Sequence, residues 1–227
     1  MRTISIALLA AALSACSHQQ AAQRGGDPGD GHPHGRHDRA DHRFRDAAAW
    51  ARRFEGPERD SWQRPEQVLA LLDLRRDMKV ADIGAGTGYF AVRLARAVPR
   101  GQVFAVDVER SMVDYLDRRA AQEGLSNLRG VLAASADPRL PAAVDLVFLC
   151  NTYHHLADRT AYFRRLAGRL APGGRVAVVD FKQGPLPVGP PESHRVSPGQ
   201  LERELTAAGY RRLLLDSTTL PHQYVAL

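Results

Sequence analysis

The chain has 227 residues, of which 44% are hydrophobic and 25% charged, close to the usage of ordinary globular proteins. This composition excludes a collagen, a low-complexity protein and a polytopic membrane protein. The formal net charge of +6 is spread thinly, so no stretch has the concentrated basic charge that is typical of nucleic-acid-binding proteins. Two cysteines, Cys16 and Cys150, cannot build a disulfide framework. The length favours a single folded domain.

The first residues have the pattern of an export signal. Arg2 precedes an almost wholly apolar run over 4–13, too short for a bilayer-spanning helix, which needs about 20 residues. Residues 13–16, Leu-Ser-Ala-Cys, match the lipobox, so the segment resembles a bacterial lipoprotein signal. The resemblance implies diacylation of Cys16 and a membrane tether on the periplasmic side, with the outer membrane favoured by Ser17. The alternative is a cytoplasmic chain with a misassigned start.

Residues 17–45 contain Gly, Asp, Arg, Gln and His with scarcely an apolar side chain. Such a segment cannot bury enough surface to offset its ordering entropy, so it is expected to be a flexible tether. Four histidines within it could gather a divalent ion: His32, His34, His37 and His42. Without a fixed geometry, a tract of this kind binds metals weakly, and we predict no metal site. A folded domain is expected over 46–227.

From residue 46 onward, helical and strand patterns alternate. Helices are expected over 46–54, 65–72, 89–98, about 110–124, about 159–170 and 198–209. Strands are expected over 79–83, 102–106, 128–133, 144–150, 175–181, 211–216 and 223–227. Asp158 and Ser197 are the expected caps of the last two helices. This alternation predicts a parallel sheet covered by helices on both faces.

A glycine-rich turn, Gly84-Ala85-Gly86-Thr87-Gly88, separates the first expected strand from a helix. A dinucleotide site would need a further glycine at position 89, where the chain has Tyr89. Asp82 places a carboxylate just before the turn, where it would repel a pyrophosphate and attract a cationic ligand. The turn therefore favours a sulfonium-bearing amino acid over a nicotinamide dinucleotide.

The nine residues over 80–88, Val-Ala-Asp-Ile-Gly-Ala-Gly-Thr-Gly, resemble the signature of class I S-adenosylmethionine-dependent methyltransferases. The similarity runs from about Trp62 to Leu227 and is greatest to the branch with quinone-biosynthesis and arsenite methyltransferases. It implies S-adenosylmethionine as the cofactor and a Rossmann-like α/β fold. The implied sheet has seven strands in the order 3-2-1-4-5-7-6, with strand 7 antiparallel.

The resemblance also implies which positions meet the cofactor. Carried over one by one, these are Asp82, Gly84, Ala85, Gly86, Gly88, Asp107, Val108, Met112, Ala136, Asp137 and Asn151. Asp107 is expected to accept hydrogen bonds from the ribose, Val108 and Met112 to flank the adenine, and Asp137 to bind the adenine amino group. Two alternatives remain open: Asp107 could cap the following helix, and Asp137 could begin an Asp-Pro turn.

Methyl transfer is a direct displacement that needs a base only if the acceptor arrives protonated. His154 and His155, in the loop after the fourth strand, lie where a base would be needed, although paired histidines could equally pack the loop. Further candidates for an acceptor pocket are Asp60, Trp62, Phe181 and His194. Cys150 is the only cysteine of this domain, which disfavours arsenite as the acceptor.

The leading interpretation is a methyltransferase that acts on a small-molecule acceptor, and a membrane tether would suit a lipophilic one. The alternative is a catalytically inactive protein of this fold, a lipoprotein that binds a ligand or a partner. A nucleic-acid methyltransferase is disfavoured, because residues 151–154 read Asn-Thr-Tyr-His where base-modifying relatives have an Asn/Asp-Pro-Pro-Tyr motif. The glycine spacing also disfavours a dehydrogenase.

Overall fold

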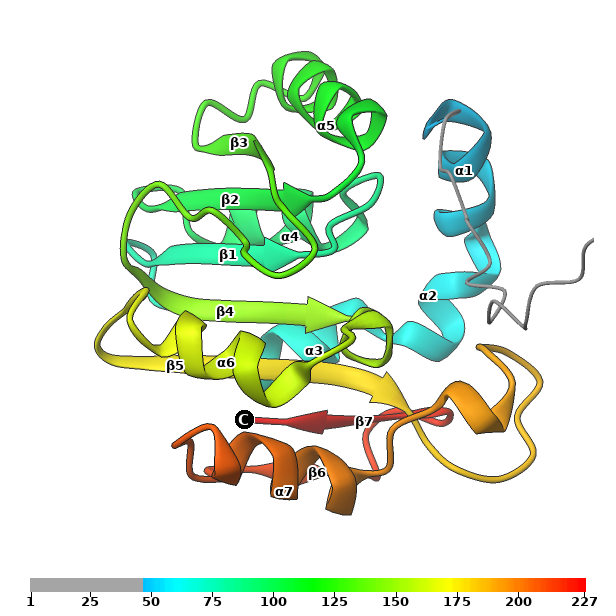
Figure 1. Cartoon of the computed structure of the whole chain (residues 1–227). Helices are drawn as coiled ribbons and strands as arrows, with labels where there is room; N and C mark the ends of the chain where they lie inside the picture. Colours follow the sequence, from blue (N-terminus) through cyan, green and yellow to red (C-terminus); the bar gives the residue numbers. More distant parts are fainter. Residues whose placement is uncertain (1–46) are drawn as a thin grey trace, which may run out of the picture. The chain divides into compact units, whose positions relative to one another are not determined.

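A computed structural model describes residues 47–227, in which seven strands form one sheet between helices (Figure 1). The strands are β1 (Lys79–Ile83), β2 (Gln102–Asp107), β3 (Leu128–Leu132), β4 (Val144–Cys150), β5 (Leu170–Phe181), β6 (Leu215–Asp216) and β7 (Gln223–Ala226). Their order is β3-β2-β1-β4-β5-β7-β6, and β7 pairs antiparallel with both β5 and β6. The predicted fold class and strand order are confirmed.

The helices follow the predicted alternation. They are α1 (Ala47–Phe54), α2 (Pro57–Gln63), α3 (Pro65–Leu71), α4 (Tyr89–Ala97), α5 (Arg110–Gln122), α6 (Arg159–Ala167) and α7 (Pro198–Ala207), with short 3-10 turns at Tyr153–His155 and Glu192–His194. Both expected caps form: Asp158 accepts from the Ala161 amide at 3.0 Å, and Ser197 accepts from the Gln200 amide at 3.2 Å. The predicted signal, Cys16 and the histidine tract lie outside the described residues.

One observed helix, α2, was not predicted, and three expected elements differ from the observed ones. The helix that follows Asp158 was expected to reach Leu170 but ends at Ala167, because Leu170 pairs with Val144 and already belongs to β5. The register between these strands then shifts, so the Pro-Gly-Gly segment over 172–174 is part of an irregular strand rather than a helix end. The strand expected over 211–216 shrinks to two residues.

Two hydrophobic clusters lie on opposite faces of the sheet, because successive strand residues point to opposite sides. On one face, Val80 and Phe148 pack with side chains of α3, α4 and α5. On the other face, Ala81 and Leu149 pack with side chains of α6 and α7. Parallel strands covered on both faces are almost continuously apolar, which makes a buried carboxylate such as Asp82 stand out.

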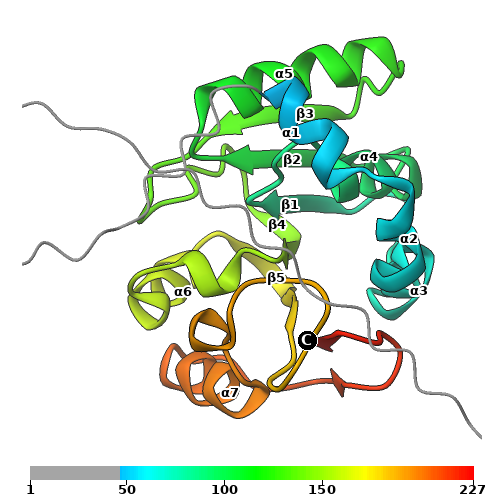
Figure 2. The same ribbon diagram turned by 90° about the vertical axis from the view of Figure 1, so that its right-hand side faces the viewer.

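Two segments lie at the carboxyl ends of the parallel strands. Figures 1 and 2 show α1 beyond the ends of β1 and β2, and the loop after β5 on the same side of the sheet. Glu55, just after α1, accepts a hydrogen bond from the Thr87 hydroxyl at 2.7 Å and forms an ion pair with Arg119 of α5. The N-terminal helices are thus fastened to the glycine turn. Among residues 47–227, no helix is long and apolar enough to cross a bilayer.

Candidate functional site

The glycine turn brings the loops after β1, β2 and β4 into contact. The amides of Gly84 and Ala85 both donate to the Val106 carbonyl, at 2.8 and 3.0 Å. Gly84 has a φ of +74°, and a Cβ atom there would lie 2.3 Å from the Thr152 hydroxyl oxygen. Gly86 has a φ of +56°, which also favours glycine. The predicted turn is therefore formed, and the loop after β4 is packed directly against it.

Asp107 ends β2 beside this turn. Its Oδ2 accepts from the Gly86 amide at 2.9 Å and its Oδ1 accepts from the Glu109 amide at 3.0 Å. Burial raises the pKa of this carboxyl above its ordinary value, while the backbone hydrogen bonds oppose the increase. The alternative that Asp107 caps the next helix is wrong, because the cap position of α5 is Glu109. Each carboxylate oxygen keeps lone pairs for further donors, such as a ribose diol.

The two residues expected to flank the adenine differ in exposure. Val108, next to Asp107, is 55% exposed, which is unusual for a large apolar side chain in this protein. Its exposure beside Asp107 fits the expected contact with adenine, which stays a prediction. Met112 is only 1% exposed, on the first turns of α5, so its side chain belongs to the core. Its expected contact with adenine stays a prediction.

Asp82 is the buried carboxylate before the turn, with 3% of its surface exposed. Burial, followed by the nearby charge of Asp107, raises the pKa of Asp82 to about 7, and the positive charge of Arg59 opposes the increase. A desolvated carboxylate of this kind is stabilised when a cation binds beside it. Two buried carboxylates would repel a pyrophosphate. The donor set therefore fits a cationic nucleoside ligand such as S-adenosylmethionine.

Asn151 belongs to a buried amide network that connects β4 with the opposite end of the chain. Its backbone has a φ of +57°, and its Oδ1 accepts a hydrogen bond from the Gln223 amide. Gln223 in turn accepts a hydrogen bond from Gln63 of α2, and both glutamines are fully buried. Sequence reasoning missed both glutamines. The signal that could have identified Gln223 is an uncharged polar residue at the start of an otherwise apolar strand.

His154 is oriented by a residue that the sequence analysis did not single out. Its Nδ1 lies 2.8 Å from Oδ1 of Asp180, a fully buried residue near the end of β5, and its amide donates to Oδ2 at 3.2 Å. The same carboxylate accepts from the Phe181 amide at 2.8 Å. With Nδ1 bonded to the carboxylate, Nε2 is the ring nitrogen that can accept a proton. The ring of His155 lies 4.2 Å from that of His154.

The other expected pocket residues divide into two groups. Trp62 and Phe181 have ring centroids 6.1 Å apart, and Phe181 lies 6.5 Å from the ring of His154, so these three share one region. His194 is exposed in the loop after β5. Asp60 faces elsewhere, because its carboxylate binds Tyr89 and Arg93. The structure therefore does not place Asp60 with the histidines.

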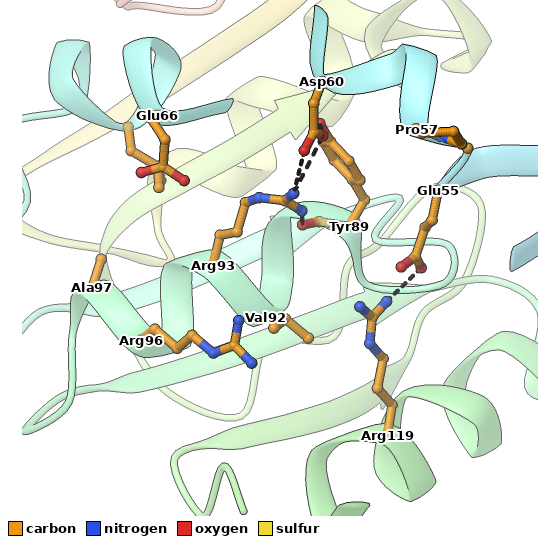
Figure 3. Close-up of a pocket in the computed structure, with 12 residues that line it drawn as sticks. Glu55, Pro57, Asp60, Glu66, Tyr89, Val92, Arg93, Arg96, Ala97 and Arg119 are labelled. Atoms are coloured by element: carbon orange, nitrogen blue, oxygen red, sulfur yellow. Dashed lines mark hydrogen bonds and ion pairs between the residues drawn. The ribbon is translucent and has the colours of Figure 1, made fainter. Parts of the chain in front are cut away.

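Asp60 lines a separate cavity of about 590 Å³ between the N-terminal helices and the outer side of α4 (Figure 3). Figure 3 shows three arginines on one side of this cavity, from α4 and α5, opposite carboxylates of the N-terminal helices. They are Arg93, Arg96 and Arg119, opposite Glu55, Asp60 and Glu66. Ion pairs join Arg93 to Asp60 and Arg119 to Glu55, so these charges mainly fasten the helices together.

Asp137 lies in the exposed loop between β3 and β4. Its Oδ1 accepts from the Arg139 amide at 2.8 Å, and its backbone pairs with that of Ala134. The turn that was the alternative for this residue is therefore present. Ala136 beside it is also exposed. Neither observation tests an adenine contact, which stays a prediction for both residues.

Comparison with known proteins identifies a methyltransferase domain within the chain. Residues 80–174 match the sequence model of a family described as a methyltransferase domain. Over 127 residues the chain is 32% identical to a 27-O-demethylrifamycin SV methyltransferase of Amycolatopsis mediterranei, covering 55% of this chain and 46% of that protein. It is 28% identical over 158 residues to a malonyl-[acyl-carrier protein] O-methyltransferase of Methylococcus capsulatus, covering 64% and 56%. The chain thus spans about half the length of these relatives.

A solved structure of an S-adenosylmethionine-dependent methyltransferase from Aquifex aeolicus is similar over most of its length. The TM-score is 0.73 at 25% sequence identity, and the match covers 78% of this chain and 95% of that one. The match therefore includes the strands outside residues 80–174 as well as the glycine turn. Residues 80–174 of this chain thus match a methyltransferase domain, and its seven-stranded sheet has the fold of class I S-adenosylmethionine-dependent methyltransferases.

Proposed function

We propose that the chain binds S-adenosylmethionine and transfers its methyl group to an oxygen atom of a small-molecule acceptor. The observation that carries this proposal is the Asp107 carboxylate, held at the end of β2 by the amides of Gly86 and Glu109. When bound, the cofactor would supply a sulfonium methyl group for attack by an acceptor nucleophile, with S-adenosylhomocysteine as the leaving group. A catalytically inactive fold would have no need of this arrangement, so that alternative gains no support.

The residues at the strand ends would divide the cofactor between them. Asp107 would accept both ribose hydroxyls, and the exposed side chain of Val108 would cover one face of the adenine. The turn over 84–88 would carry the methionine portion, with the Asp82 carboxylate beside its ammonium group. Asp137 would contact the adenine end of the cofactor, and Asn151 would contact its methionine end.

His154 is the proposed general base. An alcohol or phenol arrives protonated, so its proton must leave as the carbon–oxygen bond forms. Asp180 binds Nδ1 of the ring, which leaves Nε2 as the acceptor for that proton. Asp180 would also stabilise the imidazolium that results. His155, stacked on His154, would help to hold the ring rather than take the proton.

An oxygen acceptor is supported by the relatives, two of which are named for transfer to oxygen. A lipophilic acceptor is supported by the apolar rings of Trp62 and Phe181 beside His154. It also agrees with the resemblance to quinone-biosynthesis methyltransferases and with a membrane tether at Cys16. We therefore favour an aromatic alcohol or quinol over a charged metabolite, and we propose that the protein is anchored on the periplasmic side of a membrane.

The proposal is tested by incubating the full-length chain with labelled S-adenosylmethionine and each of a panel of acceptors, and by measuring the S-adenosylhomocysteine that forms. The panel contains a quinol, a simple phenol, an aliphatic alcohol and a tricarboxylate. We expect acceptor-dependent release with the quinol or phenol, reduced at least a hundredfold in His154→Gln. Asp114→Asn, an exposed carboxylate on α5, is the matched control and should be unchanged. Transfer only to the tricarboxylate would contradict the lipophilic assignment.

A further inference from the structure

A charged cluster lies beside the turn that carries His154. The hydroxyl of Tyr153, a fully buried residue, donates to Oε2 of Glu204 in α7 at 2.7 Å. Arg159, the first residue of α6, donates to the same carboxylate twice, from Nε at 2.6 Å and from Nη2 at 2.8 Å. The side-chain amide of Gln200 donates to Oε1 at 3.0 Å. The Glu204 carboxylate therefore binds donors from the turn, from α6 and from its own helix.

The cluster also closes the segment between β4 and α6 on itself. Arg159 donates from Nη1 to the Leu156 carbonyl at 3.2 Å, and the Leu156 amide donates to the Tyr153 carbonyl at 3.2 Å. The side chains of Arg159 and Glu204 are only 18% and 21% exposed. A bidentate pair of this kind has a fixed geometry, because two parallel hydrogen bonds set the orientation of both groups. The cluster therefore restricts the backbone over 153–159.

His154 lies between this cluster and the Asp180 carboxylate. The Tyr153 ring packs against Phe163 of α6 with centroids 5.4 Å apart, whereas the His154 ring lies 6.5 Å from that of Phe181, at the end of β5. A movement of Tyr153 would shift the backbone of His154, whose amide donates to Asp180 at 3.2 Å. A general base works at a donor–acceptor distance of about 2.6–3.2 Å, so a shift of about 1 Å would slow proton transfer.

The packing of α6 against α7, on the same face of the sheet (Figure 2), does not depend on this cluster alone. The Tyr210 hydroxyl donates to the Phe163 carbonyl at 2.9 Å, and Arg164 donates to the Ala207 carbonyl at 3.0 Å. A partly buried ion pair contributes little net stability, because the loss of hydration offsets much of the attraction. What the Glu204 cluster adds to these contacts is a fixed position for the turn.

We propose that Glu204 is a positioning residue for the base: by binding the Tyr153 hydroxyl, it fixes the turn over 153–155 so that Nε2 of His154 faces the acceptor. This inference rests on the proposed function, because it concerns the residue that is proposed to take the acceptor proton. It assigns to α7, outside the segment that matches the methyltransferase domain, a role in the rate of transfer. Glu204 and Tyr153 would both act through His154 rather than by contact with the acceptor.

Amide hydrogen exchange in the full-length chain, without ligand, tests the positioning directly. Tyr153→Phe removes only the hydroxyl, and a hydrogen bond to an ionised group is among the stronger ones. Exchange at the His154 and Leu156 amides should therefore accelerate at least tenfold relative to the amide of Val147, a buried residue of β4. Tyr210→Phe, which removes a hydroxyl from the same pair of helices, is the matched control and should leave this ratio unchanged.

Steady-state kinetics separate a positioning role from a merely structural one. For a phenol, Tyr153→Phe and Glu204→Gln should each lower kcat at least fivefold, and the double variant should lose no more than the larger single loss. The KM for S-adenosylmethionine should stay within twofold, as should kcat for an acceptor that is already ionised at the assay pH. In a His154→Gln chain, Tyr153→Phe should have no further effect. Tyr210→Phe should keep the wild-type kcat for both acceptors.

Other outcomes overturn the inference. Unchanged exchange at His154 and Leu156 in Tyr153→Phe would show that the cluster does not hold the turn. Faster exchange with an unchanged kcat would show that the position of the turn does not limit the reaction. Equal losses of kcat for both acceptors, or the same loss in Tyr210→Phe, would indicate a general effect on the fold. If the wild type transfers no methyl group to any acceptor, the proposed function fails as well, whereas the other failures leave it intact.

Discussion

Replacing Asp82 by asparagine should stabilise the protein while weakening its binding of the cofactor. The pKa of this carboxyl lies at about 7 in the fold, against an ordinary value of 3.8, because the group is buried beside another carboxylate. A raised pKa means that the folded state binds the proton more tightly than the unfolded state. Between these two values, stability is therefore lost as pH rises.

The magnitude follows from that difference in pKa. At 1.36 kcal/mol per pKa unit, burying Asp82 costs about 4 kcal/mol at pH 8, where the group is ionised, and about 2 kcal/mol at pH 5, where folding requires it to take up a proton. Asp82→Asn removes this cost but keeps the shape of the side chain. The free energy of unfolding of the variant should thus exceed that of the wild type by an amount that grows by about 2 kcal/mol between pH 5 and pH 8.

Urea denaturation of both full-length proteins at several pH values measures this difference, and the subtraction removes the contributions of all other titrating groups. Adding S-adenosylhomocysteine should narrow or reverse the difference, because the ammonium group of the ligand favours the ionised form of Asp82. A stability difference that stays constant from pH 5 to pH 8 would refute the reasoning. An advantage of the variant that is unaffected by saturating ligand would refute the contact between Asp82 and the ligand.

Three further predictions concern other parts of the domain. Gly84→Ala should lower the free energy of unfolding by about 2–4 kcal/mol, measured by thermal or urea denaturation. The added Cβ would lie 2.3 Å from the Thr152 hydroxyl, and the backbone has a φ of +74°. Adding Thr152→Gly to this variant should recover the part of the loss that comes from the clash with Thr152. Asp180→Asn should lower kcat at least a hundredfold for a phenol but much less for an acceptor that is already ionised at the assay pH, since only the phenol needs His154 as a base. Equal losses of kcat for the two acceptors would point to a structural role of Asp180. Glu204→Gln should destabilise the protein by about 1 kcal/mol above pH 4.5, because, although burial opposes it, hydrogen bonds from Arg159, Gln200 and Tyr153 lower the pKa of Glu204 to about 2. This loss should shrink as pH falls from 4.5 through 2, and urea denaturation across that range measures it.

The order of the strands and most element boundaries could be predicted because the signals are local. The strand over 79–83 is short, has three apolar residues and ends at a glycine turn, and its bounds are confirmed. Helix α2 was missed because its only apolar side chain is Trp62, so it has no hydrophobic period. The end of α6 was misplaced because Leu170 fits a helical face equally well, and only its pairing with Val144 decides the matter.

The candidate site could be predicted where one short segment carries it. Asp82, the glycine turn and Asp107 all belong to consecutive elements, so a motif and a spacing were sufficient. Asp180 could not be found in this way, because it lies on a different strand from His154. Its position beside the histidine, which is 26 residues earlier, depends on side-chain packing that no local motif records.

The most direct test of the central claim is calorimetric titration of the full-length chain with S-adenosylmethionine and S-adenosylhomocysteine, in the wild type and in Asp107→Ala. The account predicts micromolar binding of both ligands by the wild type. Loss of the ribose contact in the variant should weaken binding at least tenfold, or about 1.4 kcal/mol. Circular dichroism of both proteins would establish that they are folded. Absence of binding by a folded wild type, or equal affinity in the variant, would contradict the assignment of this site.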